Sequence, residues 1–125
     1  MLFITFFSCK NEAKEETKIS ENTVQTDIQL IQFHTEHRCE TCNNIEKLSK
    51  ETIKGNEAIS FVLYNVDDEK NAKVAEQFEA SGTSLYLYNS KTKATKDLTE
   101  MAFKYAKNEG DKFKTELQKE ISAFK

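Results

Sequence analysis

Two cysteines three residues apart, Cys39 and Cys42, constrain the fold of this chain more than any other feature. They follow a largely apolar run at residues 28–33 and open a stretch with helical periodicity. Free backbone N–H groups at a helix start favour a thiolate, and a pair with this spacing can close into a small, reducible disulfide. We expect Cys39 to be the exposed, attacking thiolate and Cys42 to lie one turn further into the helix, where it resolves a mixed disulfide.

The stretches on either side of the pair predict an alternation of strands and helices. Apolar runs rich in β-forming residues predict strands at residues 28–33, 59–64 and 85–88, and a short polar edge strand is expected near residues 94–96. Helical spacing predicts four helices: residues 39–54 with Gly55 as the C-cap, a second beginning at Asp67 or Asp68, a third with Asp97 and Glu100 as a capping box, and a last one through Phe113 and Phe124. This order predicts a single α/β domain, a thioredoxin-like three-layer sandwich in which helices cover both faces of a mixed four-stranded sheet.

Four residues near the pair are expected to support its chemistry. Arg38 places a positive charge beside Cys39 and favours the thiolate, whereas Glu40 opposes it, so we expect a weakly acidified, reducing pair. His37 can tune Cys39 or take up a proton. Thioredoxins carry a cis-proline before the third strand, facing the cysteines, but this chain has no proline. Thr83 is the expected occupant of that position, with a trans peptide bond, unless it is an ordinary loop threonine.

The same segment also suits a metal ion. Four soft or borderline ligands occur within nine residues: His34, His37, Cys39 and Cys42. This set would suit zinc or copper, but it converges only if a strand end and a helix end both direct side chains inward. A static disulfide is a third reading, although a bridge that closes so small a loop adds little stability. We therefore expect no organic cofactor, and copper or zinc only if the pair is a metal site.

The first nine residues resemble the end of a bacterial lipoprotein signal, in which a short apolar stretch and a small residue precede a cysteine. Cleavage before Cys9 would leave that cysteine lipidated at the new N-terminus. No Lys or Arg precedes the apolar stretch, so an apolar N-terminus with an incidental cysteine is the alternative. The stretch is also shorter than the roughly 20 residues that span a membrane. Residues 10–27 are polar and predict a flexible tether, or else an N-terminal helix, before the domain at residues 28–125.

The net charge and the expected lipid anchor limit the kinds of partner that the protein is expected to bind. The net charge is −3 and no basic run with interleaved aromatic residues occurs, so we expect no nucleic-acid partner. A lipid anchor on Cys9 would attach the protein to the membrane in the bacterial cell envelope, facing the periplasm or the cell surface. The expected partners there are protein thiols and disulfides.

Several segments resemble a bacterial thioredoxin-like family, the nitrophenyl compound nitroreductase subunit, ArsF family. The similarity is carried mainly by Phe33, His34, Arg38, Cys39, Thr41, Cys42, Ile45 and Glu46. Residues 64–67, 83–85, 96–98 and 111–113 are also similar, so that the resemblance extends over about residues 28–124. It implies a thioredoxin-like fold, and the family's description implies a part in nitroaromatic reduction, although the chain carries no flavin-binding signal.

Three functions therefore follow from the sequence. The first is an envelope-anchored thiol–disulfide oxidoreductase that uses Cys39 and Cys42. The second is a copper- or zinc-binding module built on the same cysteines with His34 or His37. The third is a non-catalytic accessory subunit that shares the fold.

Overall fold

The computed structural model describes residues 26–124 and contains four strands and four α-helices. The strands are β1 (Ile28–His34), β2 (Ile59–Asn65), β3 (Ser84–Asn89) and β4 (Thr95–Asp97). The helices are α1 (Glu40–Ile53), α2 (Ala72–Gln77), α3 (Thr99–Ala106) and α4 (Gly110–Ala123), and one turn of 3₁₀-helix, η2 (Glu69–Asn71), leads into α2. The order of strands and helices is the one predicted from the sequence.

The four strands form one mixed sheet in the order β2-β1-β3-β4. Strand β1 pairs in parallel with β2 and antiparallel with β3, and β3 pairs antiparallel with β4. Ile31, in the middle of β1, lies between Val62 of β2 and Tyr86 of β3. Because β1 has a hydrogen-bonded neighbour on each side, it is a central strand, which explains its nearly continuous apolar sequence.

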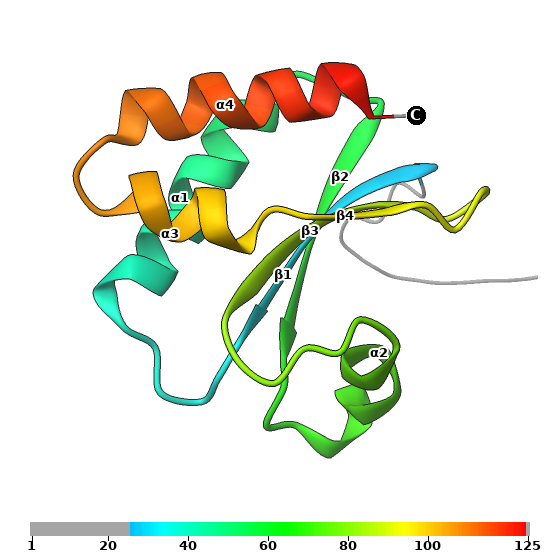
Figure 1. Cartoon of the computed structure of the whole chain (residues 1–125). Helices are drawn as coiled ribbons and strands as arrows, with labels where there is room; N and C mark the ends of the chain where they lie inside the picture. Colours follow the sequence, from blue (N-terminus) through cyan, green and yellow to red (C-terminus); the bar gives the residue numbers. More distant parts are fainter. Residues whose placement is uncertain (1–25, 125) are drawn as a thin grey trace, which may run out of the picture.

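Successive side chains of a strand point to opposite faces, so β1 contributes to two separate cores. Leu30 packs on the face that is covered by α1, α3 and α4, whereas Ile31 and Phe33 pack on the face that is covered by α2. Figure 1 shows these helices on the two sides of the sheet. The protein is thus an α/β structure with helices on both faces, as predicted.

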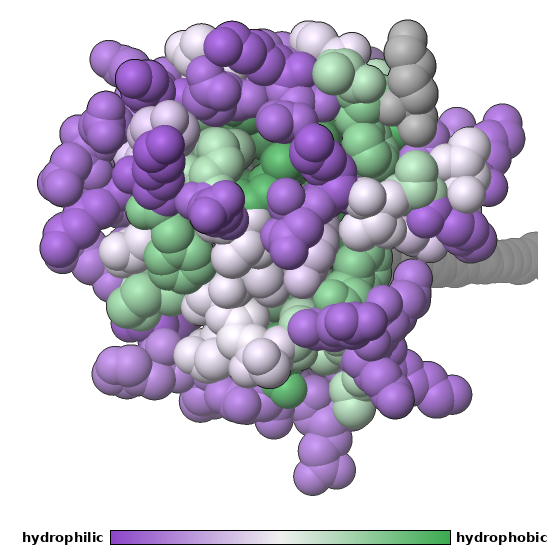
Figure 2. Space-filling model, viewed as in Figure 1, coloured by the Kyte–Doolittle hydropathy of each residue, from purple (hydrophilic) through white to green (hydrophobic). Residues whose placement is uncertain are grey.

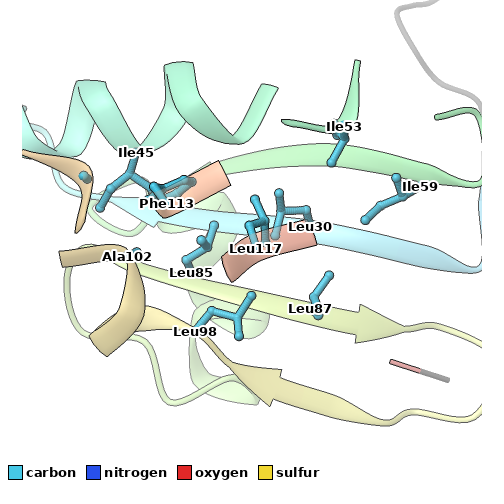
Figure 3. Close-up of a cluster of buried hydrophobic side chains, with 11 residues drawn as sticks. Leu30, Ile45, Ile53, Ile59, Leu85, Leu87, Leu98, Ala102, Phe113 and Leu117 are labelled. Carbon is cyan, nitrogen blue, oxygen red and sulfur yellow. The ribbon is translucent and has the colours of Figure 1, made fainter. Parts of the chain in front are cut away.

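The larger core, here called the aliphatic cluster, consists mainly of Leu, Ile and Ala side chains. Figure 3 shows them converging between the sheet and the helices. Its buried members are Leu30, Ile45, Ile53, Ile59, Leu85, Leu87, Leu98, Ala102, Ala106, Phe113 and Leu117. Helix α4 approaches α1 closely at Gly110, where an added Cβ would lie 3.2 Å from Leu48.

The smaller core, here called the aromatic cluster, lies beneath α2. Its buried members are Ile31, Phe33, Ala75, Phe78, Tyr86 and Tyr88. The ring of Phe78 lies 5.1 Å from that of Tyr88 and 5.3 Å from that of Tyr86, distances typical of favourable aromatic pairs. The hydroxyl of Tyr86 also donates to the backbone oxygen of Phe78 at 3.1 Å, which gives this buried polar group a partner.

The helix ends differ from the sequence prediction in several places. Asp68, an expected start of the second helix, caps the 3₁₀ turn η2 rather than α2 itself. The C-cap of α1 is Lys54 rather than Gly55, which follows it with φ +85°, a conformation that suits a glycine just after a helix. Helix α3, however, does not use Asp97 in a capping box, because Asp97 is the last residue of β4 and Leu98 is the N-cap. The carboxylate of Asp97 still accepts the N–H of Thr99 at 2.9 Å, so it satisfies one free donor of the helix from outside.

Hydrophilic residues cover most of the surface shown in Figure 2, and more hydrophobic ones show between them. Within the described range, no helix is both long and apolar enough to cross a membrane. The expected lipidation at Cys9 and nearly all of the expected tether lie outside the described residues. Thr26 and Asp27, the last residues of that tether, bond to the sheet: Thr26 Oγ1 donates to Ser60 Oγ and Asp27 O accepts from Ser90 N.

Candidate functional site

The two cysteines lie together at the start of α1. Cys39 is the N-cap residue, with φ −94° and ψ 169°, and its sulfur accepts the backbone N–H of Cys42 at 3.3 Å. The two sulfurs are 2.6 Å apart, and within residues 26–124 neither forms a disulfide. Cys39 is exposed, whereas Cys42 is only 3% exposed. One sulfur can therefore meet a partner while the other stays protected behind it.

Thr83 is brought next to the pair from the loop before β3. Its Oγ1 lies 3.0 Å from the sulfur of Cys42, although the two residues are 41 positions apart in the sequence. All peptide bonds in residues 26–124 are trans, including the one before Thr83. A hydroxyl at this distance can donate to a Cys42 thiolate or accept from its thiol.

These contacts lower the pKa of the Cys42 thiol below its usual value of 9.0. Burial raises this pKa, but hydrogen bonds from Cys39 and Thr83 lower it by more, and the charge of Arg38 acts in the same direction.

Arg38 is held beside the pair by Glu46, which the sequence reasoning did not assign to the site. The guanidinium Nη2 lies 2.8 Å from Glu46 Oε1, close enough for an ion pair but not aligned as a hydrogen bond. Glu46 Oε2 also binds Lys50 at 2.7 Å. Burial raises the pKa of Glu46, but the hydrogen bond to Lys50 and the positive charges of Lys50 and Arg38 lower it by more, so the net direction is down. The i,i+4 spacing of Glu46 and Lys50 was the available sequence signal.

The other acidic and imidazole groups of the loop make no hydrogen bond to the sulfurs within the described residues. Glu36 is bound to the end of β2, where its Oε1 accepts from Asn65 Nδ2 and its N–H donates to Asp67, both at 2.7 Å. Glu40 and His37 are exposed at the start of α1 and in the loop before it. A supporting role for Glu40 or His37 therefore stays a prediction.

The four candidate metal ligands are not assembled around a common point. Nδ1 of His34 lies 2.8 Å from the backbone oxygen of Thr35, its immediate neighbour. Within residues 26–124, no three His, Cys, Asp or Glu side chains are grouped so that they could hold a metal ion. Copper or zinc on Cys39 and Cys42 therefore stays a prediction with two close ligands rather than four.

Gln32 is a further residue that sequence reasoning passed over as part of an apolar strand. Its side chain is completely buried, and its Nε2 donates to the backbone oxygen of Cys42 at 3.0 Å. The available signal was its polarity, because a Gln in the middle of a strand that is buried on both faces needs a hydrogen-bonding partner.

Comparisons with known proteins do not identify a family. No protein-family model and no curated protein matches the chain. Among solved structures, one described as "Structure of a malarial protein" is 21% identical and has a TM-score of 0.45. The match covers 63% of this chain and 93% of that one. A similarity at this level supports no inference about fold or activity, so a function has to be argued from the site.

Proposed function

We propose that this chain is a thiol–disulfide oxidoreductase with a thioredoxin-like fold. The observation that carries the proposal is the pair of sulfurs 2.6 Å apart at the N-terminus of α1, one exposed and one buried. The fold assignment is supported by the parallel β1-α1-β2 unit, by β3 antiparallel beside β1, and by the position of the pair at the turn from β1 into α1.

The reaction needs only the two cysteines and a disulfide substrate. The Cys39 thiolate attacks one sulfur of the substrate disulfide, the substrate's S–S bond breaks, and one half leaves as a thiolate. Cys42 then gives up its proton and attacks Cys39 Sγ, which forms the Cys39–Cys42 disulfide and releases the other half. The substrate gains two electrons and the pair loses two.

Two features favour the step at Cys39. The N–H of Cys42 donates to its sulfur, and a helix N-terminus stabilises negative charge. The N–H contact and the exposure of Cys39 make it the attacking group, and the burial of Cys42 keeps the second sulfur from reacting with outside disulfides.

The remaining parts of the proposal come from the sequence. We propose a reducing pair that exchanges with protein thiols and disulfides, in a protein held at the bacterial cell envelope by a lipid on Cys9. Similarity to the ArsF family belongs to this proposal as well, since the resemblance rests on the segment that contains the cysteines.

The direct test is reduction of insulin disulfides with dithiothreitol as the electron donor. We expect the wild-type chain to accelerate insulin reduction and Cys39→Ser to lose the acceleration completely. Cys9→Ser is the matched control, because it removes the other cysteine of the chain and should retain full activity. An inactive wild-type protein that keeps stoichiometric zinc or copper, lost in Cys42→Ser, would contradict the proposal in favour of a metal-binding module.

A further inference from the structure

Gln32 places a polar side chain inside the protein at the centre of the sheet. It lies on β1 between Leu63 of β2 and Leu85 of β3 and is completely buried. By alternation it shares the face of Leu30, which is the face that α1 covers. Leucines surround this position in the sheet, so an apolar residue would suit its environment, and the amide requires a local explanation.

The amide of Gln32 binds the helix that carries the cysteines. Its Nε2 donates to the backbone oxygen of Cys42 at 3.0 Å. A carbonyl oxygen has two lone pairs, so the oxygen of Cys42 can accept this bond in addition to one from within the helix. The bond connects the central strand to the first turn of α1 at the residue that carries the buried sulfur.

The oxygen of the Gln32 amide does not contribute to stability. Gln32 Oε1 is buried and has no hydrogen-bond partner among the described residues, and an unsatisfied buried acceptor is unfavourable. Ser49 offers a matched comparison, because it is also completely buried on α1 and its Oγ also lacks a partner within residues 26–124. Ser49, however, has no hydrogen bond to either cysteine in that range.

This inference rests on the exchange reaction proposed above. We infer that Gln32 is a positioning residue for the second step of that reaction. Its amide holds the first turn of α1 in place while Cys39 carries a mixed disulfide, so that Cys42 Sγ stays aligned for attack on Cys39 Sγ. In this step the proton of Cys42 passes to solvent, the S–S bond between Cys39 and the substrate breaks, and the substrate leaves as a thiolate. Because an amide does not titrate, Gln32 does this without placing a charge behind the pair.

Dithiobis(nitrobenzoate), an aromatic disulfide whose released thiolate is coloured, separates the two steps. In the reduced full chain with Cys9→Ser, attack by Cys39 releases the first equivalent and attack by Cys42 releases the second. In Gln32→Met, which has similar length and no amide, we expect an unchanged first release. The second release should slow about tenfold, the factor that corresponds to one lost buried hydrogen bond. Ser49→Ala should change neither release.

Gln32→Glu supplies a second variant with a different signature. A protonated Glu can still donate to the oxygen of Cys42, whereas an ionised Glu cannot. We therefore expect the second release to be close to the wild-type rate at acid pH and to slow as the new carboxyl ionises. The wild-type chain should lack this transition, and a residue with only a structural role would not produce it.

The possible results distinguish the positioning role of Gln32 from the exchange function on which that role rests. If both Gln32 variants released the second equivalent as fast as the wild type at every pH, the positioning role would be overturned while the exchange function stood. A slowdown that Ser49→Ala reproduced would also overturn the role. If the Cys9→Ser protein without a further substitution released only the first equivalent, the exchange function itself would fail.

Discussion

The two faces of the sheet carry different kinds of buried side chain, and they differ in their role in the molecule. The aliphatic cluster, under α1, α3 and α4, supports the helix whose first turn carries the cysteines. The aromatic cluster, under the short helix α2, consists mainly of tilted and edge-on rings around Phe33 and Phe78. Both cysteines, Arg38 and the amide of Gln32 are associated with the start of α1, on the first face.

This difference indicates that stability and chemistry are partly separated in the molecule. Strand β1 supplies buried side chains to both faces, so each cluster contributes to holding the central strand. Only the aliphatic cluster continues into α1, through Ile45 one turn beyond Cys42. We therefore expect substitutions on the aromatic face to lower stability with little effect on the thiols, and substitutions beside the first turn of α1 to do the reverse.

The largest expected effect on stability comes from truncating one large buried side chain in each cluster. Phe113→Ala and Phe78→Ala should each lower the free energy of unfolding by about 3–5 kcal/mol, because each leaves a cavity. Phe113 should lie at the upper end, since it is 0% exposed and Phe78 is 8% exposed. Urea unfolding measures both values, and thiol reactivity is then compared under conditions where both variants are folded. Altered cysteine reactivity in Phe78→Ala would break the separation of the two faces.

Thr83→Val should change the titration of the thiols more than it changes the stability of the fold. The hydrogen bond from Thr83 lowers the pKa of Cys42, so its loss should raise that pKa towards 9.0. An acid with a lowered pKa in the folded state stabilises the fold above its unfolded pKa, and this contribution disappears as pH falls through the folded value. The reduced variant should therefore lose stability mainly at alkaline pH. Ultraviolet absorbance of the thiolate as a function of pH measures the shift.

A matched control for Thr83→Val is Thr99→Val, at another threonine whose hydroxyl makes a structural bond. Thr99 Oγ1 accepts the N–H of Leu85 at the start of β3 and, within the described residues, makes no hydrogen bond to either sulfur. This variant should lower stability at all pH values without moving the thiolate titration. A titration curve unchanged in Thr83→Val would show that the Thr83 hydroxyl does not act on the pair.

Glu46→Gln should have the smallest effect on stability. It should also lower the pKa of Cys42, whereas Thr83→Val should raise it. Removing the partner of Arg38 should lower stability by about 0.5–1 kcal/mol at neutral pH, as for a partly exposed ion pair. The pKa of Glu46 is lowered from 4.5, so this contribution is present above 4.5 and is lost as pH falls through the lower folded value. The variant should therefore match the wild type in strong acid, which urea unfolding at both pH values would show.

Without Glu46, the charge of Arg38 is no longer neutralised nearby, so the pKa of Cys42 should fall further. Glu51→Gln is the control, because it makes the same change on the same helix where the carboxylate pairs with Lys114 instead. It should leave the thiolate titration unchanged. A thiol pKa that rose in Glu46→Gln would show that Arg38 needs its partner in order to act on the sulfurs.

The sequence predicted the order of elements because apolar periodicity and turn residues record it locally. Cys39 and Cys42 could be placed at a helix start for the same reason. The sequence could not show that Glu46 holds Arg38, or that Gln32 reaches Cys42, since these contacts depend on side-chain directions after the helix has packed on the sheet. The start of α3 was misplaced because Asp97 can serve a helix from the end of a strand as well as from the N-cap.

The bonds of Thr26 and Asp27 to the sheet have a practical consequence for attaching this protein to anything else. They precede the first residue of β1, whereas the cysteines follow its last one, so the seven residues of the strand separate the two ends by about 20 Å. A surface, resin or fusion partner joined through the N-terminal side of the domain would therefore meet the end of the sheet that is remote from Cys39. Immobilised protein should keep its exposed sulfur accessible to macromolecular substrates.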